Sequence, residues 1–120
     1  MRKKKRILVA DDDVAILDVV ELMLVEEGYE VETIADGESL FNIQQNPDLI
    51  LLDISMSGFD GRDICKHIKS KEHTKYIPII IMSANRDTQI IAAEAGADDF
   101  LAKPFEMNFF LEKVKNYTSK

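Results

Sequence analysis

Short apolar runs alternate with amphipathic stretches five times along this chain of 120 residues. Such alternation predicts strands and helices in turn, which is typical of an α/β fold with a parallel sheet. Because crossovers between parallel strands are right-handed, helices should cover both faces of that sheet. The expected architecture is a three-layer α/β/α sandwich of the (βα)5 type. We expect strands at 6–10, 30–34, 48–53, 77–83 and 98–102, and helices at 13–27, 36–46, 60–70, 86–95 and 106–118.

The middle of the chain indicates how the sheet is buried. The runs Leu49–Leu52 and Ile77–Met82 are continuously apolar rather than alternating, as expected of strands that are covered on both faces. With 120 residues, of which 46% are hydrophobic, the chain can form one core but not two. We therefore expect residues 1–120 to form a single domain.

Composition also restricts location and partners. No apolar stretch reaches 18 residues, so neither a membrane-spanning helix nor a normal signal peptide is expected. Cys65 is the only cysteine, which suits a reducing compartment, and we expect a cytoplasmic protein. The net charge of −7 disfavours direct binding to nucleic acid. The basic run Arg2–Arg6 is an exception, either a solvated start of the chain or a patch for an anionic partner.

Four of the apolar runs end in chemically active residues: Asp11–Asp13, Asp53, Ser83 and Lys103. If the runs are parallel strands, these residues meet at the carboxyl edge of the sheet, where open α/β folds bind ligands. Two carboxylates a few ångströms apart repel by about 4 kcal/mol at an effective dielectric constant near 20, so cations are needed between them. Lys103 supplies one positive charge. A divalent metal with hard oxygen ligands, Mg²⁺ or Mn²⁺, supplies the rest.

Each of these residues also has a structural interpretation. Asp13 precedes the first predicted helix, and we interpret it as the N-cap, whereas Asp11 and Asp12 are interpreted as metal ligands. The Ser83 hydroxyl could instead bond to nearby backbone. A salt bridge between Asp53 and Lys103 is compatible with a metal site beside it.

Taken together, four motifs resemble the receiver domain of bacterial two-component response regulators. They are Asp11–Asp12 after Ile-Leu-Val-Ala, Asp53 in Leu-Ile-Leu-Leu-Asp, Ser83 in Ile-Ile-Ile-Met-Ser-Ala, and Lys103 in Phe-Leu-Ala-Lys-Pro-Phe. Each motif alone is weak, but their order and spacing are specific and extend from about residue 5 to 118. The resemblance implies a flavodoxin-like sheet with strand order 2-1-3-4-5. It also implies a stand-alone regulator similar to chemotaxis regulators, or an intermediate in a phosphorelay.

The resemblance further implies roles for the residues. Asp53 would accept a phosphoryl group from a phosphohistidine on a sensor histidine kinase or phosphotransfer protein. Asp12, Asp53 and the backbone carbonyl of Ser55 would ligate Mg²⁺ directly, with Asp11 acting through water. Lys103 would pair with the carboxylate and then with a phosphoryl oxygen.

Two further residues would form the switch. Ser83 would hydrogen-bond another phosphoryl oxygen, and Phe100 matches the aromatic switch position. Phosphorylation would then change the face made by the fourth helix, fifth strand and fifth helix, which would bind a downstream protein. The protein would be a regulator rather than an enzyme, catalysing only its own phosphotransfer and slow dephosphorylation.

Two departures from the family pattern stand out. Met56–Ser57 replaces the usual Met-Pro after the phosphoacceptor, and Phe100 lacks the hydroxyl of a tyrosine. The competing class is a phosphatase of the haloacid-dehalogenase type. Residues Asp11–Asp13 superficially resemble the Asp-x-Asp nucleophile motif of these enzymes. That motif has Thr or Val two residues after its second Asp, where this chain has Ala15, and such enzymes also have a cap domain and a longer chain. Turnover of a phosphate-ester substrate would distinguish a phosphatase from a receiver domain. A pseudo-receiver is disfavoured because every site residue is present.

Overall fold

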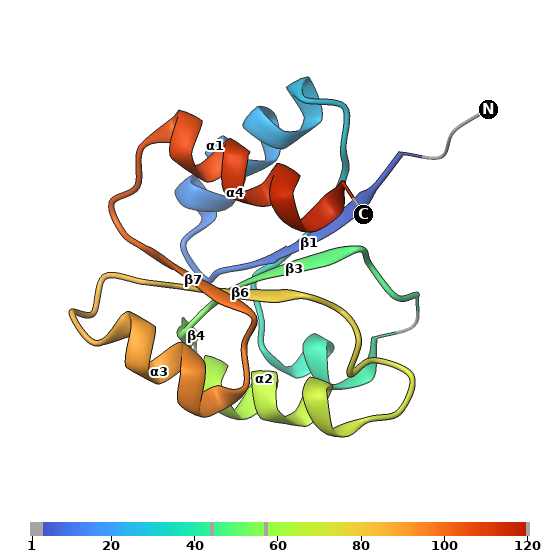
Figure 1. Cartoon of the computed structure of the whole chain (residues 1–120), viewed down its shortest axis with the longest axis vertical. Helices are drawn as coiled ribbons and strands as arrows, with labels where there is room; N and C mark the ends of the chain where they lie inside the picture. The colour runs from blue at the N-terminus through green and yellow to red at the C-terminus, as the bar shows by residue number, and fades with distance from the viewer. Residues whose placement is uncertain (1–3, 44, 57, 120) are drawn as a thin grey trace.

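The sheet has five parallel strands in the order β2-β1-β3-β6-β7 (Figure 1). Numbered among these five alone, that order is 2-1-3-4-5, so the predicted topology is confirmed. The structure, a computed structural model, describes residues 4–43, 45–56 and 58–119. Its sheet strands are β1 (Arg6–Ala10), β2 (Glu30–Ile34), β3 (Leu49–Asp53), β6 (Ile79–Ser83) and β7 (Asp99–Ala102).

Helices cover both faces of the sheet. Helices α1 (Val14–Glu26) and α4 (Met107–Thr118) lie on one face, while α2 (Gly61–Ser70) and α3 (Thr88–Ala95) lie on the other (Figure 1). Each face packs its own apolar cluster against the sheet. The predicted three-layer sandwich is therefore confirmed.

The second predicted helix, 36–46, is wrong in type and length. Its place is taken by a short 3₁₀ helix, η1 (Glu38–Asn42). The Asp36 carboxylate accepts hydrogen bonds from the Ser39 backbone N, at 2.9 Å, and from the Ser39 hydroxyl. Such side-chain bonds to nearby backbone favour a tight turn over a continuing helix. Leu40 anchors the segment through a side chain that is only 1% exposed, and residue 44 lies outside the described part of the chain.

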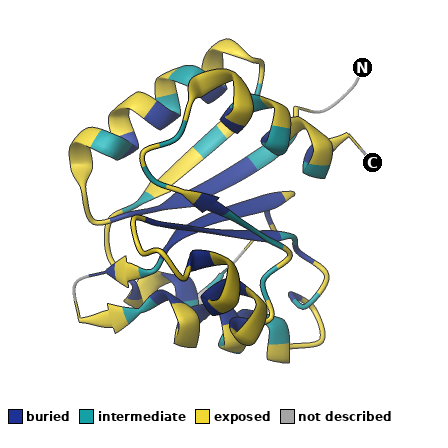
Figure 2. Ribbon diagram, turned by 60° about the vertical axis from the view of Figure 1, so that its left-hand side comes forward, coloured by how far each residue is buried: buried dark blue, intermediate teal, exposed yellow. Residues whose placement is uncertain are grey.

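The two middle strands form the centre of the core. Every residue of β3 and β6 is buried (Figure 2), as their continuous apolar runs predict. Strand β2 at the sheet edge is instead exposed or only partly buried. Because β3 is buried along its whole length and ends in Asp53, the Asp53 carboxylate lies at the carboxyl edge of the sheet, directly after the apolar core.

The helix ends agree with the local sequence. The Asp13 carboxylate accepts hydrogen bonds from the backbone N of Ala15 and Ile16, at 3.0 and 3.3 Å, so its predicted N-cap position is confirmed. Cys65 is buried in α2, and burial raises the pKa of its thiol to about 11, as expected of an unreactive core residue. Among the described residues, no helix is both long and apolar enough to cross a bilayer.

Candidate functional site

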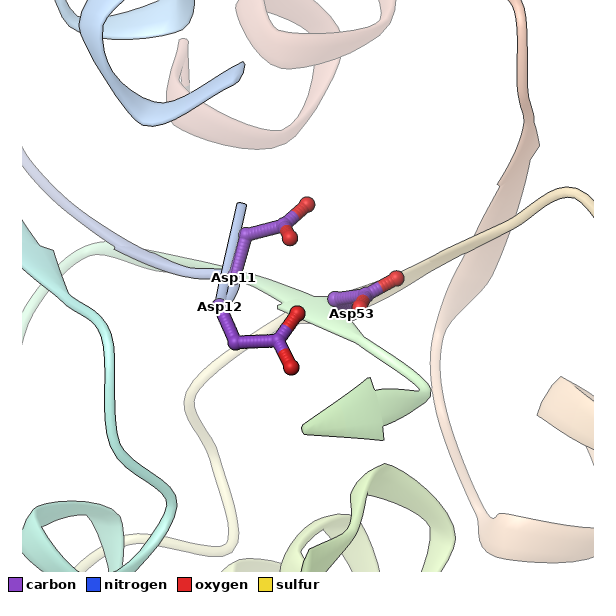
Figure 3. Close-up of side chains that lie close together, drawn as sticks. All are labelled: Asp11, Asp12 and Asp53. Carbon is purple, nitrogen blue, oxygen red and sulfur yellow. The ribbon is translucent and has the colours of Figure 1, made fainter. Parts of the chain in front are cut away.

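Three carboxylates meet at the carboxyl edge of the sheet. In the register of β1 and β3, Ala10 lies beside Leu52, so the residues that follow, Asp11 and Asp53, emerge next to each other. The carboxylates of Asp11, Asp12 and Asp53 each place an oxygen within 4.8 Å of the others, and the three side chains lie close together (Figure 3). Asp11 is 1% exposed and Asp53 6%, whereas Asp12 faces solvent.

Lys103 connects two of these carboxylates. It follows β7 directly, and its Nζ donates hydrogen bonds to Asp11 Oδ2 at 2.8 Å and to Asp53 Oδ1 at 3.1 Å. Its backbone N donates to the Ser83 carbonyl at 2.8 Å, which ties the loop after β7 to the end of β6. The Lys103–Pro104 peptide bond is cis. The salt bridge expected from the sequence is thus present, with Asp11 as a second partner.

The charges at the site do not balance within this group. Burial and the charge of Asp11 raise the pKa of Asp53, and Lys103 offsets only part of that effect. Burial disfavours the charged form of Lys103, but its bonds to Asp11 and Asp53 outweigh this and raise its pKa. Within this group of four side chains, one ammonium lies beside three carboxylates, and two of these, Asp11 and Asp53, are buried. Clustered carboxylate oxygens with excess negative charge fit a hard divalent cation such as Mg²⁺ or Mn²⁺.

Ser83 ends β6 beside this cluster. It lies one residue beyond Met82, the residue that pairs with Asp53, and it is buried. Its Oγ accepts a hydrogen bond from the Asn85 backbone N at 2.9 Å, so the local bond considered in the sequence analysis is present. A hydroxyl has two lone pairs and one hydrogen, so this bond leaves the hydrogen free to be donated.

The loop after Asp53 is folded more tightly than the sequence indicated. Ser55 and Met56 form β4, which pairs antiparallel with β5 (Phe59–Asp60). This hairpin was not predicted, and Ser57 within it lies outside the described residues. The backbone of Ser55, the expected source of a carbonyl ligand, is therefore held by a short ladder.

Gly61 packs directly against the backbone of Asp53, and the sequence did not indicate this contact. A Cβ at Gly61 would lie 2.5 Å from the Asp53 carbonyl oxygen and 2.7 Å from Ile54 Cα. The Gly61 backbone N donates to the Ile54 carbonyl at 2.7 Å. Glycine is thus required for α2 to begin directly against the loop of Asp53. The available signal was a glycine near the start of the predicted helix 60–70.

Phe100 lies on β7 at some distance from the carboxylates. It pairs with Ile81, while Ala102 pairs with Ser83, so strand alternation places Phe100 and Ser83 on the same face of the sheet. The ring is partly buried against the cluster on the α3 side. Asp11, Asp12, Asp53 and Lys103 therefore form the centre of the site, and Ser83 lies beside it. Phe100 lies further back along β7, two residues before the residue that pairs with Ser83.

Comparison with known proteins identifies the family to which this chain is similar. The family model for the response regulator receiver domain matches residues 7–115, nearly the whole chain. Among curated relatives, the DNA-binding dual master transcriptional regulator RpaA of Synechocystis is 38% identical over 114 residues, which is 92% of this chain. The chain spans only 47% of the length of that relative.

Solved structures of similar proteins have the same fold. The receiver domain of sensor histidine kinase PA1611 from Pseudomonas aeruginosa, with magnesium coordinated in its active site cleft, is 29% identical. The match has a TM-score of 0.89 and covers 98% of this chain and 100% of that one. The BeF3-activated receiver domain of DrrB, a Thermotoga maritima protein, is 28% identical, with a TM-score of 0.86 and coverage of 98% and 100%.

Proposed function

The chain belongs to the family of response regulator receiver domains, and from this premise we propose that it is a phosphorylation switch with Asp53 as phosphoacceptor. The observation that carries the proposal is the hydrogen bonding of one ammonium, Lys103 Nζ, to both Asp11 and Asp53 at the carboxyl edge of the sheet. A nucleophilic carboxylate beside a cation and further carboxylates is the arrangement that phosphoryl transfer needs.

The reaction uses few protein groups. An Asp53 carboxylate oxygen attacks the phosphorus of a phosphohistidine, an O–P bond forms, and the P–N bond breaks to release the imidazole. Lys103 then pairs with a phosphoryl oxygen, and the Ser83 hydroxyl donates to another. Mg²⁺, or Mn²⁺, held by Asp12, Asp53 and the Ser55 carbonyl, with Asp11 acting through water, would supply positive charge for the phosphoryl oxygens.

Ser83 and Phe100 couple phosphorylation of Asp53 to a change at the protein surface. When Ser83 is drawn toward the phosphoryl group, Phe100 turns inward and the face formed by α3, β7 and α4 changes shape. That Phe100 and Ser83 share one face of adjacent strands supports this coupling. Because Phe100 has no phenol oxygen, its inward position leaves no hydroxyl unsatisfied.

The proposed partners are proteins. A sensor histidine kinase or phosphotransfer protein supplies the phosphoryl group in the cytoplasm, and a downstream protein binds the altered face. Residues 1–120 act as one receiver domain in this proposal. The relative RpaA is a DNA-binding regulator about twice as long as the matched region, and the net charge of −7 here argues against direct DNA contact by this chain.

Labelling with a small phosphodonor tests the proposal. Incubation with acetyl phosphate and Mg²⁺ should add one phosphoryl group, detected by intact mass and removed by hydroxylamine. Asp53→Asn should abolish labelling, while Asp18→Asn, at an exposed position of α1, should leave it unchanged. Labelling of Asp53→Asn at the wild-type rate would refute the assignment.

A further inference from the structure

A lysine on α4 contacts the aromatic ring at the proposed switch position. Lys113 Nζ lies 5.4 Å from the centroid of the Phe100 ring and 5.1 Å from that of Phe109. Both distances are within the range of attractive cation–π contacts. The Lys113 side chain is only 17% exposed, so most of it is buried.

The position of Lys113 is fixed by a carboxylate on β7. Its Nζ forms an ion pair with Asp99 Oδ1 at 3.1 Å. The same oxygen accepts the Phe100 backbone N at 2.7 Å, and Asp99 Oδ2 accepts the Tyr117 hydroxyl at 2.9 Å. Asp99 is thus held from two sides, and Lys113 is held by Asp99.

This cluster lies at an open edge of the sheet. Strand β7 is the last strand in the sheet order, so Lys113 reaches around it from α4 to the ring of Phe100, which packs on the α3 side. An inward turn of the ring toward Ser83 would separate it from the ammonium, because Asp99 keeps Lys113 at the edge.

We propose that Lys113 is a positioning residue that holds Phe100 at the sheet edge and so sets the resting position of the switch. The inference rests on the proposed function, in which an inward Phe100 accompanies phosphorylation. A contact made in only one of two conformations shifts their equilibrium toward that conformation. Lys113 therefore opposes activation, and a phosphoryl group on Asp53 must overcome its hold on the ring.

Lys113→Met tests the proposal, because methionine keeps an unbranched apolar side chain and removes the charge. The probe is beryllofluoride with Mg²⁺, which mimics an aspartyl phosphate. We expect it to bind Lys113→Met roughly two- to thirty-fold more tightly than wild type, the range that loss of one cation–π contact implies. NMR of labelled phenylalanine should show a larger inward population of Phe100 without the probe. Lys115→Met, an exposed change on the same helix, should match wild type in both measurements.

A purely structural role would give a different result. A variant that was only destabilised would bind the probe no better than wild type, so equal or weaker binding by Lys113→Met would overturn the inference. In a Phe100→Ala background, Lys113→Met should have no further effect. A persistent gain there would show that Lys113 acts by another route, and the inference would be wrong. Failure of the wild-type protein to bind the probe at all would instead contradict the proposed function.

Discussion

Removing Lys103 should destabilise the metal-free protein far more than removing a surface lysine. At an effective dielectric constant near 20, its attraction to Asp11 at 2.8 Å is about 6 kcal/mol and to Asp53 at 3.1 Å about 5 kcal/mol. Burying the ammonium offsets much of this attraction. Loss of one partner from a buried ion pair typically costs about 3–5 kcal/mol, and we expect Lys103→Met to lower the free energy of unfolding by that amount.

Urea unfolding in EDTA at about pH 7.5 measures this loss, and the chain offers a matched control. The Lys75–Glu72 ion pair also has an N–O distance of 3.1 Å, but the Glu72 side chain is 89% exposed. Lys75→Met should cost less than about 1 kcal/mol, as exposed pairs do. If the two variants lose equal stability, solvent screens the Lys103 pairs and the reasoning from burial is wrong.

Mg²⁺ and acid should each restore part of the stability of Lys103→Met. Mg²⁺ bound among the same carboxylates stabilises the folded state by mass action, so the melting temperature of the variant should rise with added Mg²⁺. Burial and Asp11 raise the pKa of Asp53, and loss of Lys103 raises it further. Above its unfolded pKa, the folded protein then binds the proton more tightly than the unfolded chain, so stability rises as pH falls. The deficit relative to wild type should therefore shrink from about pH 7.5 to about pH 5.

Three further predictions concern single residues. Gly61→Ala should cost about 1–3 kcal/mol in urea unfolding, because its Cβ meets the Asp53 backbone; a gain from helix propensity would contradict the close contact. Burial opposes ionisation of Asp99, but bonds from Phe100 N, Lys113 and Tyr117 outweigh it and lower its pKa below 3.8. The difference in free energy of unfolding between wild type and Asp99→Asn should have its largest value above that pH and should disappear as pH falls through the lowered pKa. A difference that does not depend on pH would refute the lowered pKa of Asp99. Asp13→Ala should cost about 1 kcal/mol in the same urea assay through loss of the α1 cap, and no loss would show that the cap contributes nothing.

The sequence predicted the sheet well because its signals were strong and local. Continuous apolar runs identified the buried strands, and the residue after each run identified the edge where polar groups meet. Once the strands were parallel, the meeting of Asp11 and Asp53 followed from register alone. Asp13 was assigned correctly because an N-cap depends on the residues that directly follow it.

The parts that sequence could not predict depend on contacts between distant segments. The 36–46 segment has a helical pattern, but Asp36 and Ser39 close a turn there and Gly37 packs on Phe59 of the hairpin. The contact of Lys113 with Phe100 joins a helix to a strand around the sheet edge, and no spacing in the sequence encodes it. Secondary-structure propensity depends on residues that are neighbours along the chain, whereas these contacts form only when distant segments meet in the folded protein.

The order in which the site residues occur along the chain has a consequence for folding. Strands β1 and β3 bring Asp11, Asp12 and Asp53 together, but Lys103 follows β7, the last strand to be synthesised. A nascent chain that paired its first strands early would gather carboxylates before their lysine had left the ribosome. Closure of the sheet by β7 is thus also the step that brings the positive charge of Lys103 to these carboxylates.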